Sequence, residues 1–296
     1  MTDYRKRIID EWTHLGFRYF EETMWSSSLQ QKDLPKIKGL LSINNFSNVD
    51  VALAIPQDDT IERIRWLRYY QIDQCMSVPY GVRIPTGSNH LKFTLGFTNA
   101  EERGNQYSNS IAAANIIRLI FGVPAARELM LASHFSDENS DSGPYSDIGY
   151  ASPFDNQSIN LFENPPIEKT ELNNIPQEAS LLLDKAFVQP YAHERFILMW
   201  LAFEAIVHSF PGGGDNGEKR QRFFVQELNS NTINEEVYRL FKFRNSIFKE
   251  GVFSNTNVDD ECWSLYAVLQ LAIMKDCPQR QAFLEGYEKI LNQRRG

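Results

Sequence analysis

The stretch LLLDKAFVQPYAHERFILMWLAFEAIVHSF, residues 181–210, places apolar side chains three or four positions apart, which is the period of an α-helix. The same period continues in four later segments, residues 218–228, 234–251, 259–275 and 278–293. The glycines that follow Pro211, and Pro278 itself, stand where helices commonly stop and start. This half of the chain is therefore predicted to form five or six helices that pack as a compact bundle.

The amino-terminal half has a mixed pattern. Short alternating segments predict strands at residues 39–44, 49–55, 80–85 and 90–97. Helical periods predict a helix at residues 2–25 and another at residues 109–135 that is interrupted at residues 122–124. Residues 64–72, which follow a possible cap at Asp59 and Glu62, fit either a capped helix or a strand. Residues 136–166 are rich in Ser, Asp, Asn, Gly and Pro and predict a linker. We therefore expect an α+β fold: a mixed domain over residues 1–165 and an all-α bundle over residues 166–296.

Composition and charge exclude several classes of protein. The chain has 296 residues, of which 42% are hydrophobic, so it is long and apolar enough to form real cores. Its net charge of −8 argues against a protein that coats nucleic acid through many Lys and Arg contacts. The excess of acidic residues is distributed unevenly along the chain. Residues 1–168 contain 15 basic and 21 acidic residues, whereas residues 169–296 contain 15 basic and 17 acidic residues. A local cationic cleft is thus compatible with the helical half.

The cysteines and the apolar segments indicate the compartment. The three cysteines are far apart in sequence and show neither a CxxC pair nor histidines at metal-ligand spacing. We find no apolar core of a signal peptide, and the most apolar long segment is interrupted by charged residues. We therefore expect a cytoplasmic protein with reduced thiols, no membrane association, no metal and no cofactor.

The glycine-rich segment Gly212–Arg220 superficially resembles a phosphate-binding loop. That loop requires Gly, four residues and then Gly-Lys-Ser/Thr after a strand. Here Glu218 is interposed, Arg220 stands where the hydroxyl belongs, and the segment follows a predicted helix. The sequence therefore predicts a loop between helices at this place.

The segment FKFRNSIFKEG, residues 241–251, carries the most specific signal. Together with LAFEAI at residues 201–206, its Arg244-Asn245 pair resembles the HEPN superfamily (higher eukaryotes and prokaryotes nucleotide-binding), in particular the Apea-like group of bacterial anti-phage proteins. The resemblance covers about residues 178–296. It implies a helical bundle that forms a homodimer, in which paired Arg-Asn helices line a metal-independent ribonuclease cleft.

The residue types of this motif suit RNA chemistry. In such a cleft a base removes the proton of a ribose 2′-hydroxyl, and Arg stabilises the charge that develops on the attacked phosphate. The resemblance gives that phosphate role to Arg244, with Asn245 orienting it or donating to the phosphate. Glu204 lies in a very apolar stretch and needs a partner, for which we expect a basic residue such as Arg244. Arg244 has the alternative of a purely structural pair with Glu204, Glu235 or Glu236.

Lys249 stands where the family has its histidine. A histidine is partly neutral near pH 7, whereas a lysine side chain is ordinarily protonated there and is a poor base. Three interpretations follow: Lys249 binds phosphate without cleavage, it acts as an acid while His208 or Glu204 supplies the base, or the site has decayed and the bundle only dimerises.

The sequence predicts two alternative functions. The first is a ribonuclease of a bacterial defence or toxin system, with Arg244, Asn245, Lys249 and Glu204 as site residues. The alternative is a non-catalytic module that dimerises or binds RNA or protein and regulates a partner. For the acidic amino-terminal domain we expect recognition of a protein partner or a small ligand.

Overall fold

The structure, a computed structural model, describes residues 3–54, 62–71, 74–83, 89–103, 108–127, 129–138, 142–145, 169–189, 191–250 and 257–295. The α+β prediction is confirmed. The chain divides into two compact units. The sheet unit comprises Met1–Pro35, Asn48–Gln106 and Pro124–Gly149, and the helical unit comprises Lys36–Ser47, Tyr107–Val123 and Tyr150–Gly296. Two segments of the amino-terminal half thus belong to the helical unit, so a single cut at residue 165 does not describe the division.

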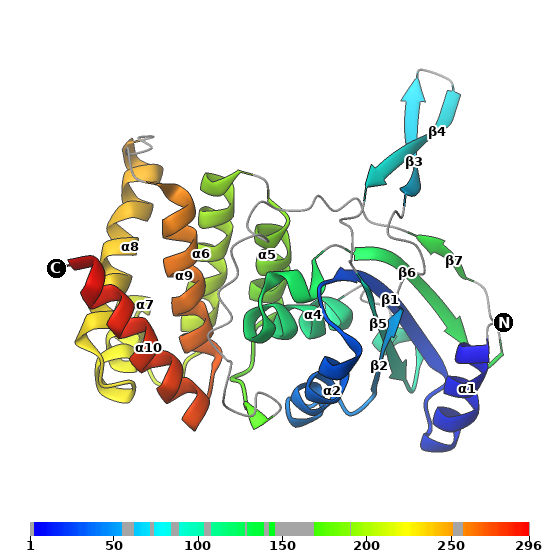
Figure 1. The fold of residues 1–296 in the computed structure, drawn as a ribbon, viewed down its shortest axis with the longest axis horizontal. Helices are drawn as coiled ribbons and strands as arrows, with labels where there is room; N and C mark the ends of the chain where they lie inside the picture. Colours follow the sequence, from blue (N-terminus) through cyan, green and yellow to red (C-terminus); the bar gives the residue numbers. More distant parts are fainter. Residues whose placement is uncertain are drawn as a thin grey trace. The chain divides into compact units, whose positions relative to one another are not determined.

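The sheet unit is built on five antiparallel strands in the order β2-β5-β1-β6-β7 (Figure 1). Their bounds are Tyr19–Ser27 (β1), Val49–Ala54 (β2), Asn89–Phe97 (β5), Leu129–Ser136 (β6) and Ser142–Tyr145 (β7). The same unit holds the two-stranded β3–β4 pair (Glu62–Gln71 and Gln74–Arg83), helix α1 (Asp3–Trp12) and the single turn α3 (Ala100–Arg103).

The core of the sheet unit depends on α1 and the central strand. Ile8 of α1 packs against Phe20 of β1 and Phe135 of β6, and the rings of Phe20 and Phe135 stack with centroids 4.8 Å apart. Gly96 lies opposite Phe20 in β5, and a Cβ there would come within 2.7 Å of the Trp12 ring. A glycine is therefore needed for α1 to approach the sheet this closely.

Several local predictions in this half are wrong for one shared reason. The predicted helix over residues 2–25 ends at Trp12, because residues 19–27 pair with strands on both sides. Likewise, residues 129–136 form β6 instead of continuing a helix. Residues 39–43 lie in helix α2 (Leu34–Ile43) and residue 44 in the turn that follows it, so this segment is not a strand. In each case long-range packing overrides the local pattern.

Other predictions in this half are confirmed or fall outside the described residues. Residues 49–54 and 90–97 are strands as predicted, and residues 62–71 are a strand, not a helix. Within the predicted linker, residues 142–145 form β7, which pairs with β6. Residues 139–141 and 146–168 of that linker lie outside the described residues.

The helical unit contains the predicted carboxy-terminal helices together with α2 and α4 (Ser108–Phe121). After residue 176 the described part of the chain forms six α-helices, in agreement with the prediction of five or six. They are α5 (Gln177–Phe187), α6 (Ala192–His208), α7 (Asn216–Gln221), α8 (Asn231–Glu250), α9 (Val258–Ile273) and α10 (Pro278–Arg295), with a π-helical turn at Arg222–Glu227. Helix α9 is buried along almost its whole length and packs against α6, α8 and α10, and α5 packs against α6 (Figure 1).

Helix α4 is anchored in the helical unit by polar contacts that lie inside the core. The carbonyl of Arg118 accepts a hydrogen bond from the hydroxyl of Tyr266, and the carbonyl of Leu119 accepts one from the amide of Gln270 at 2.6 Å. The Arg118 guanidinium is fully buried and pairs with Asp184 of α5 at 2.7 Å. These contacts explain why α4 belongs to this unit in spite of its position in the sequence.

Among the described residues, the structure has no helix that is both long and apolar enough to cross a bilayer.

Candidate functional site

Helix α8 positions the predicted motif. Its first turn is capped by Ser230, whose hydroxyl oxygen accepts a hydrogen bond from the backbone N–H of Ile233 at 3.1 Å. Its buried side chains recur every three or four residues and hold one face in the core: Ile233, Val237, Leu240, Phe243 and Ile247. This burial leaves the remaining faces, which carry the motif cations, at or near the surface.

Arg244 is held in place by its own helix. Its Nη1 donates to Oδ1 of Asn245 at 3.0 Å, and its guanidinium carbon lies 4.6 Å from the centre of the Phe248 ring. The Nε atom is buried without a hydrogen-bond partner. Within the described part of the chain, no carboxylate lies at ion-pair distance from Arg244. Asn245 is therefore in the orienting position, and the guanidinium keeps donors for another acceptor.

The expected pair between Glu204 and Arg244 is wrong. Glu204 forms its ion pair with Arg220, and its Oε2 accepts a hydrogen bond from Asn216 at 2.5 Å. Arg220 also lies over the ring of Phe241, 5.2 Å from its centre. Glu204 therefore has both partners on α7, the neutral Asn216 twelve residues later and the cationic Arg220 sixteen residues later.

The structural pairs considered for Arg244 with Glu235 and Glu236 are also not formed. Glu236 accepts two hydrogen bonds from Arg239, which in turn binds Glu261. Burial alone would raise the pKa of Glu236, but the hydrogen bonds and charge of Arg239 outweigh it and lower that pKa below its ordinary value. The main ion-pair network of α8 thus centres on Arg239, one turn before the motif.

The outer face of α8 combines cations with exposed aromatic rings. Lys249 is exposed in the last turn. Phe248 and Tyr238 are 50% and 58% exposed, and the Lys242 ammonium lies 4.5 Å from the centre of the Tyr238 ring. A cavity of about 280 Å³ opens beside Tyr238 and is bounded by Phe241 and Arg220. This face can offer positive charge and ring surface to the same ligand.

Other aromatic residues in and beside the motif segments are core residues. Trp200 and Phe203 are no more than 1% exposed, and the ring of Phe243 packs edge-on against Phe196. These rings stabilise the bundle and are not available for stacking on bases.

Arg220 and Asn216 belong to this site but were missed in the sequence. The available signal was the carboxylate of Glu204 in an apolar stretch, which requires a buried partner. The partner itself is not readable from spacing, because Arg220 follows a loop whose path depends on the tertiary fold.

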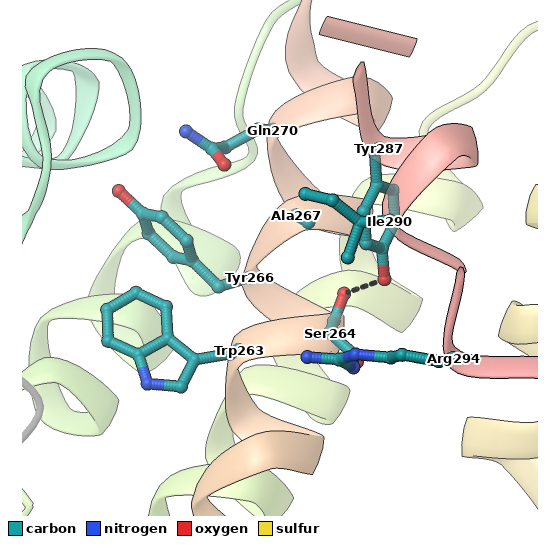
Figure 2. Close-up of a pocket in the computed structure, with 8 residues that line it drawn as sticks. All are labelled: Trp263, Ser264, Tyr266, Ala267, Gln270, Tyr287, Ile290 and Arg294. Carbon is teal, nitrogen blue, oxygen red and sulfur yellow. Dashed lines mark hydrogen bonds between the residues drawn. The ribbon is translucent and has the colours of Figure 1, made fainter. Parts of the chain in front are cut away.

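A second pocket lies between α9 and α10 (Figure 2). Its volume is about 50 Å³, and Trp263 and Ile290 contribute to its mostly apolar wall. The polar groups at its edge bind each other: the Tyr287 hydroxyl donates to the Ser264 carbonyl at 3.2 Å, and Arg294 donates to the Ser264 hydroxyl at 3.3 Å. Burial raises the pKa of Tyr287, which keeps this hydroxyl a donor. The pocket is therefore a packing gap whose polar rim is already satisfied.

The structure also bears on cysteine and metal chemistry. Cys262 is buried, its thiol contacts the Ala192 carbonyl at 3.3 Å, and burial raises its pKa to about 12. It is thus a poor nucleophile. In the ranges that the structure describes, no group of three or more His, Cys, Asp or Glu side chains is arranged to hold a metal ion.

No family model, curated protein or solved structure matches the chain. The resemblance to HEPN domains therefore stays a prediction that depends on the motif residues.

Proposed function

We propose that the helical unit is an RNA-binding module that contacts phosphates through Arg244 and Lys249. The observation that carries this proposal is the state of Arg244, which is oriented by Asn245 and the Phe248 ring but has no carboxylate partner among the described residues. A structural arginine ordinarily has its charge compensated by a carboxylate. A guanidinium that is positioned but not neutralised suits a phosphate, whose oxygens match its planar set of donors.

The surroundings of Arg244 favour a single-stranded nucleic acid. Lys249 adds a second positive charge at the exposed end of the same helix, and Phe248 and Tyr238 present ring surface beside the cations. Single-stranded RNA is bound by this combination, because phosphates follow cations while bases stack on aromatic rings. The overall charge of −8 is compatible with such a compact site, although it opposes non-specific coating.

The geometry supports binding better than cleavage. Metal-independent cleavage needs a base for the 2′-hydroxyl. Of the two bases considered from the sequence, Glu204 is engaged by Arg220 and Asn216, and His208 is exposed at the end of α6. Lys249 in its protonated form fits a phosphate ligand or an acid for the leaving oxygen. We therefore place RNA binding first and a variant ribonuclease second.

We further propose that two copies associate through this region. Leu201 of α6 is 39% exposed, and Tyr238 and Phe248 of α8 are still more exposed. Pairing these faces about a two-fold axis would cover the apolar surface. It would also bring two copies of Arg244 and Lys249 together, which doubles the local positive charge.

The proposal is tested by fluorescence anisotropy with a labelled single-stranded RNA, in EDTA and at constant salt. We expect Arg244→Ala and Lys249→Ala each to weaken binding about tenfold or more, the value for loss of one charge-assisted contact. Lys289→Ala removes an exposed lysine from α10 and serves as the matched control, with unchanged affinity.

The same samples are examined for cleavage on denaturing gels. Intact RNA with the native chain and cleavage after Lys249→His would indicate a binding module derived from a nuclease. If the native chain cleaves RNA and Arg244→Ala abolishes this cleavage, the protein is a variant ribonuclease and not only a binding module. If the native chain neither binds nor cleaves, or if Arg244→Ala binds as well as the native chain, the proposal is wrong.

A further inference from the structure

A second cationic cavity lies near the glycine-rich loop that follows α6. Its volume is about 260 Å³, and its lining includes Lys219 of α7 and Arg222 of the π-helical turn. Asn173, Asn174 and Ser209 contribute neutral polar groups to the wall. None of these residues belongs to the Arg244 motif.

Lys219 is the unusual member of this cavity. The residue is only 9% exposed, and its ammonium donates to the carbonyl of His208 at 2.6 Å. No carboxylate pairs with it among the described residues. Because a buried charge is costly unless it is paired, and because an ammonium has three donors, Lys219 is suited to an anionic ligand.

Arg222 supplies the second positive charge. Its two terminal nitrogens donate to the carbonyls of Pro211 and Gly213 at 3.1 and 2.8 Å, which hold the guanidinium against the loop. These acceptors are neutral, so they leave its charge uncompensated, and donors of the planar group remain available.

The acidic residue of the cavity does not cancel these charges. Glu227 lines the same cavity and pairs with Arg280 at 3.0 Å, and the almost fully buried Arg280 also pairs with Asp276 at 2.9 Å. Lys219 and Arg222 therefore outnumber the single acidic residue of the lining, and neither pairs with a carboxylate in the part of the chain that the structure describes. A phosphate monoester carries nearly two negative charges near neutral pH and has three strong acceptor oxygens, so it matches this pair better than a single carboxylate does.

We propose that this cavity binds a phosphate monoester, with Lys219 and Arg222 as its phosphate ligands. The remaining volume and the asparagine-lined wall accommodate a small polar group attached to the phosphate. The side chains, and not a backbone cradle of the phosphate-binding-loop type, provide the recognition. This site is separate from the proposed RNA contact, so either can fail while the other stands.

The loop itself offers a sharp test. Gly212 has φ +92°, and a Cβ there would clash with Nη1 of Arg222, so Gly212→Ala should displace the guanidinium without changing the net charge. Gly213 is the matched control, because an added Cβ meets nothing within 4 Å and its backbone is not in the left-handed region.

The measurement is calorimetric titration of the full chain with ribose 5-phosphate, inorganic phosphate and ribose. We expect ribose 5-phosphate to bind and ribose not to bind. Gly212→Ala, Arg222→Gln and Lys219→Met should each weaken binding about tenfold or more, whereas Gly213→Ala and Lys289→Met should leave it unchanged. Because Lys219 is buried, thermal unfolding is recorded for every variant, and the exposed Arg222 and the glycine pair decide the outcome if Lys219→Met does not fold.

The two phosphate probes distinguish the source of the ligand. Tighter binding of ribose 5-phosphate indicates a monoester site, and equal binding of inorganic phosphate shows that the organic group is not recognised and overturns the monoester assignment. If neither phosphate probe binds, the assignment of the cavity is wrong. It is also wrong if Gly212→Ala and Gly213→Ala lose the same amount of affinity.

Discussion

Two arginines of the helical unit lie in opposite surroundings. Arg118 of α4 is fully buried, and its guanidinium binds Asp184 at 2.7 Å and Asn115 at 3.0 Å. Arg244 of α8 is half-buried and is held by a neighbouring amide and a ring, without a carboxylate among the described residues. This difference separates structural arginines from ligand-binding ones. An arginine whose charge is paired with a carboxylate stabilises the fold, whereas an arginine that is oriented but not paired with a carboxylate is available to bind a ligand.

The largest effect is expected at the Arg118 pair. Asp184→Ala leaves a buried guanidinium without its counter-charge, so we expect a loss of about 3–5 kcal/mol in the free energy of unfolding. Urea denaturation followed by circular dichroism measures it. The double variant Arg118→Met/Asp184→Leu removes both charges and should regain much of this loss, because the cost lies mainly in the unpaired ion. A loss below about 1 kcal/mol in Asp184→Ala would show that the pair is not structural in this sense.

An intermediate effect on stability is expected from the ion pairs of Arg239, which binds Glu236 and Glu261. The folded-state pKa of Glu236 is lowered, so its contribution to stability is complete above its ordinary value of about 4.5 and is lost as the pH falls through the lowered value. Glu236→Gln should therefore cost about 1–3 kcal/mol at neutral pH and show a shallower loss of stability on acidification. Urea midpoints between pH 7 and pH 3 measure both. Identical pH profiles for the native chain and Glu236→Gln would contradict the assignment.

The smallest effect on stability is expected at Arg244. Arg244→Ala removes a cation–ring contact and one hydrogen bond but leaves no buried carboxylate behind, so the loss should be below about 1 kcal/mol. The same variant should give the tenfold weaker RNA binding described above. If Arg244→Ala unfolds as readily as Asp184→Ala, the comparison fails and Arg244 is a structural residue.

Prediction from the sequence was most successful where local pattern and tertiary environment agree. In α6 and α8 the apolar period coincides with the faces that the bundle buries, so the helices were predicted correctly. It failed at residues 129–136, where the apolar run fits a helix but pairing with β1 makes a strand. Short apolar runs do not distinguish these structures, because the deciding hydrogen bonds come from distant residues.

The residues of the candidate sites also divide into those that local sequence predicts and those that depend on the tertiary fold. The motif Arg244-Asn245 and its position near the end of a helix are readable from the sequence, since adjacent residues and helical period place them. The partner of Glu204 and the partner of Arg118 are not readable, because Arg220 and Asp184 lie 16 and 66 residues away. Likewise, the sequence around Lys219 predicts only a loop between helices, whereas the fold buries Lys219 in the lining of a cavity beside Arg222.

The amino-acid pattern alone therefore establishes a helical carboxy-terminal half, a mixed amino-terminal half and a cationic motif on one helix. It does so because these features depend on neighbours within a few turns. The tertiary structure decides which cations are neutralised, that α4 joins the helical unit, and where a cavity remains beside Lys219 and Arg222. Charge compensation and burial are properties of residues brought together from distant positions, and only the folded chain brings them together.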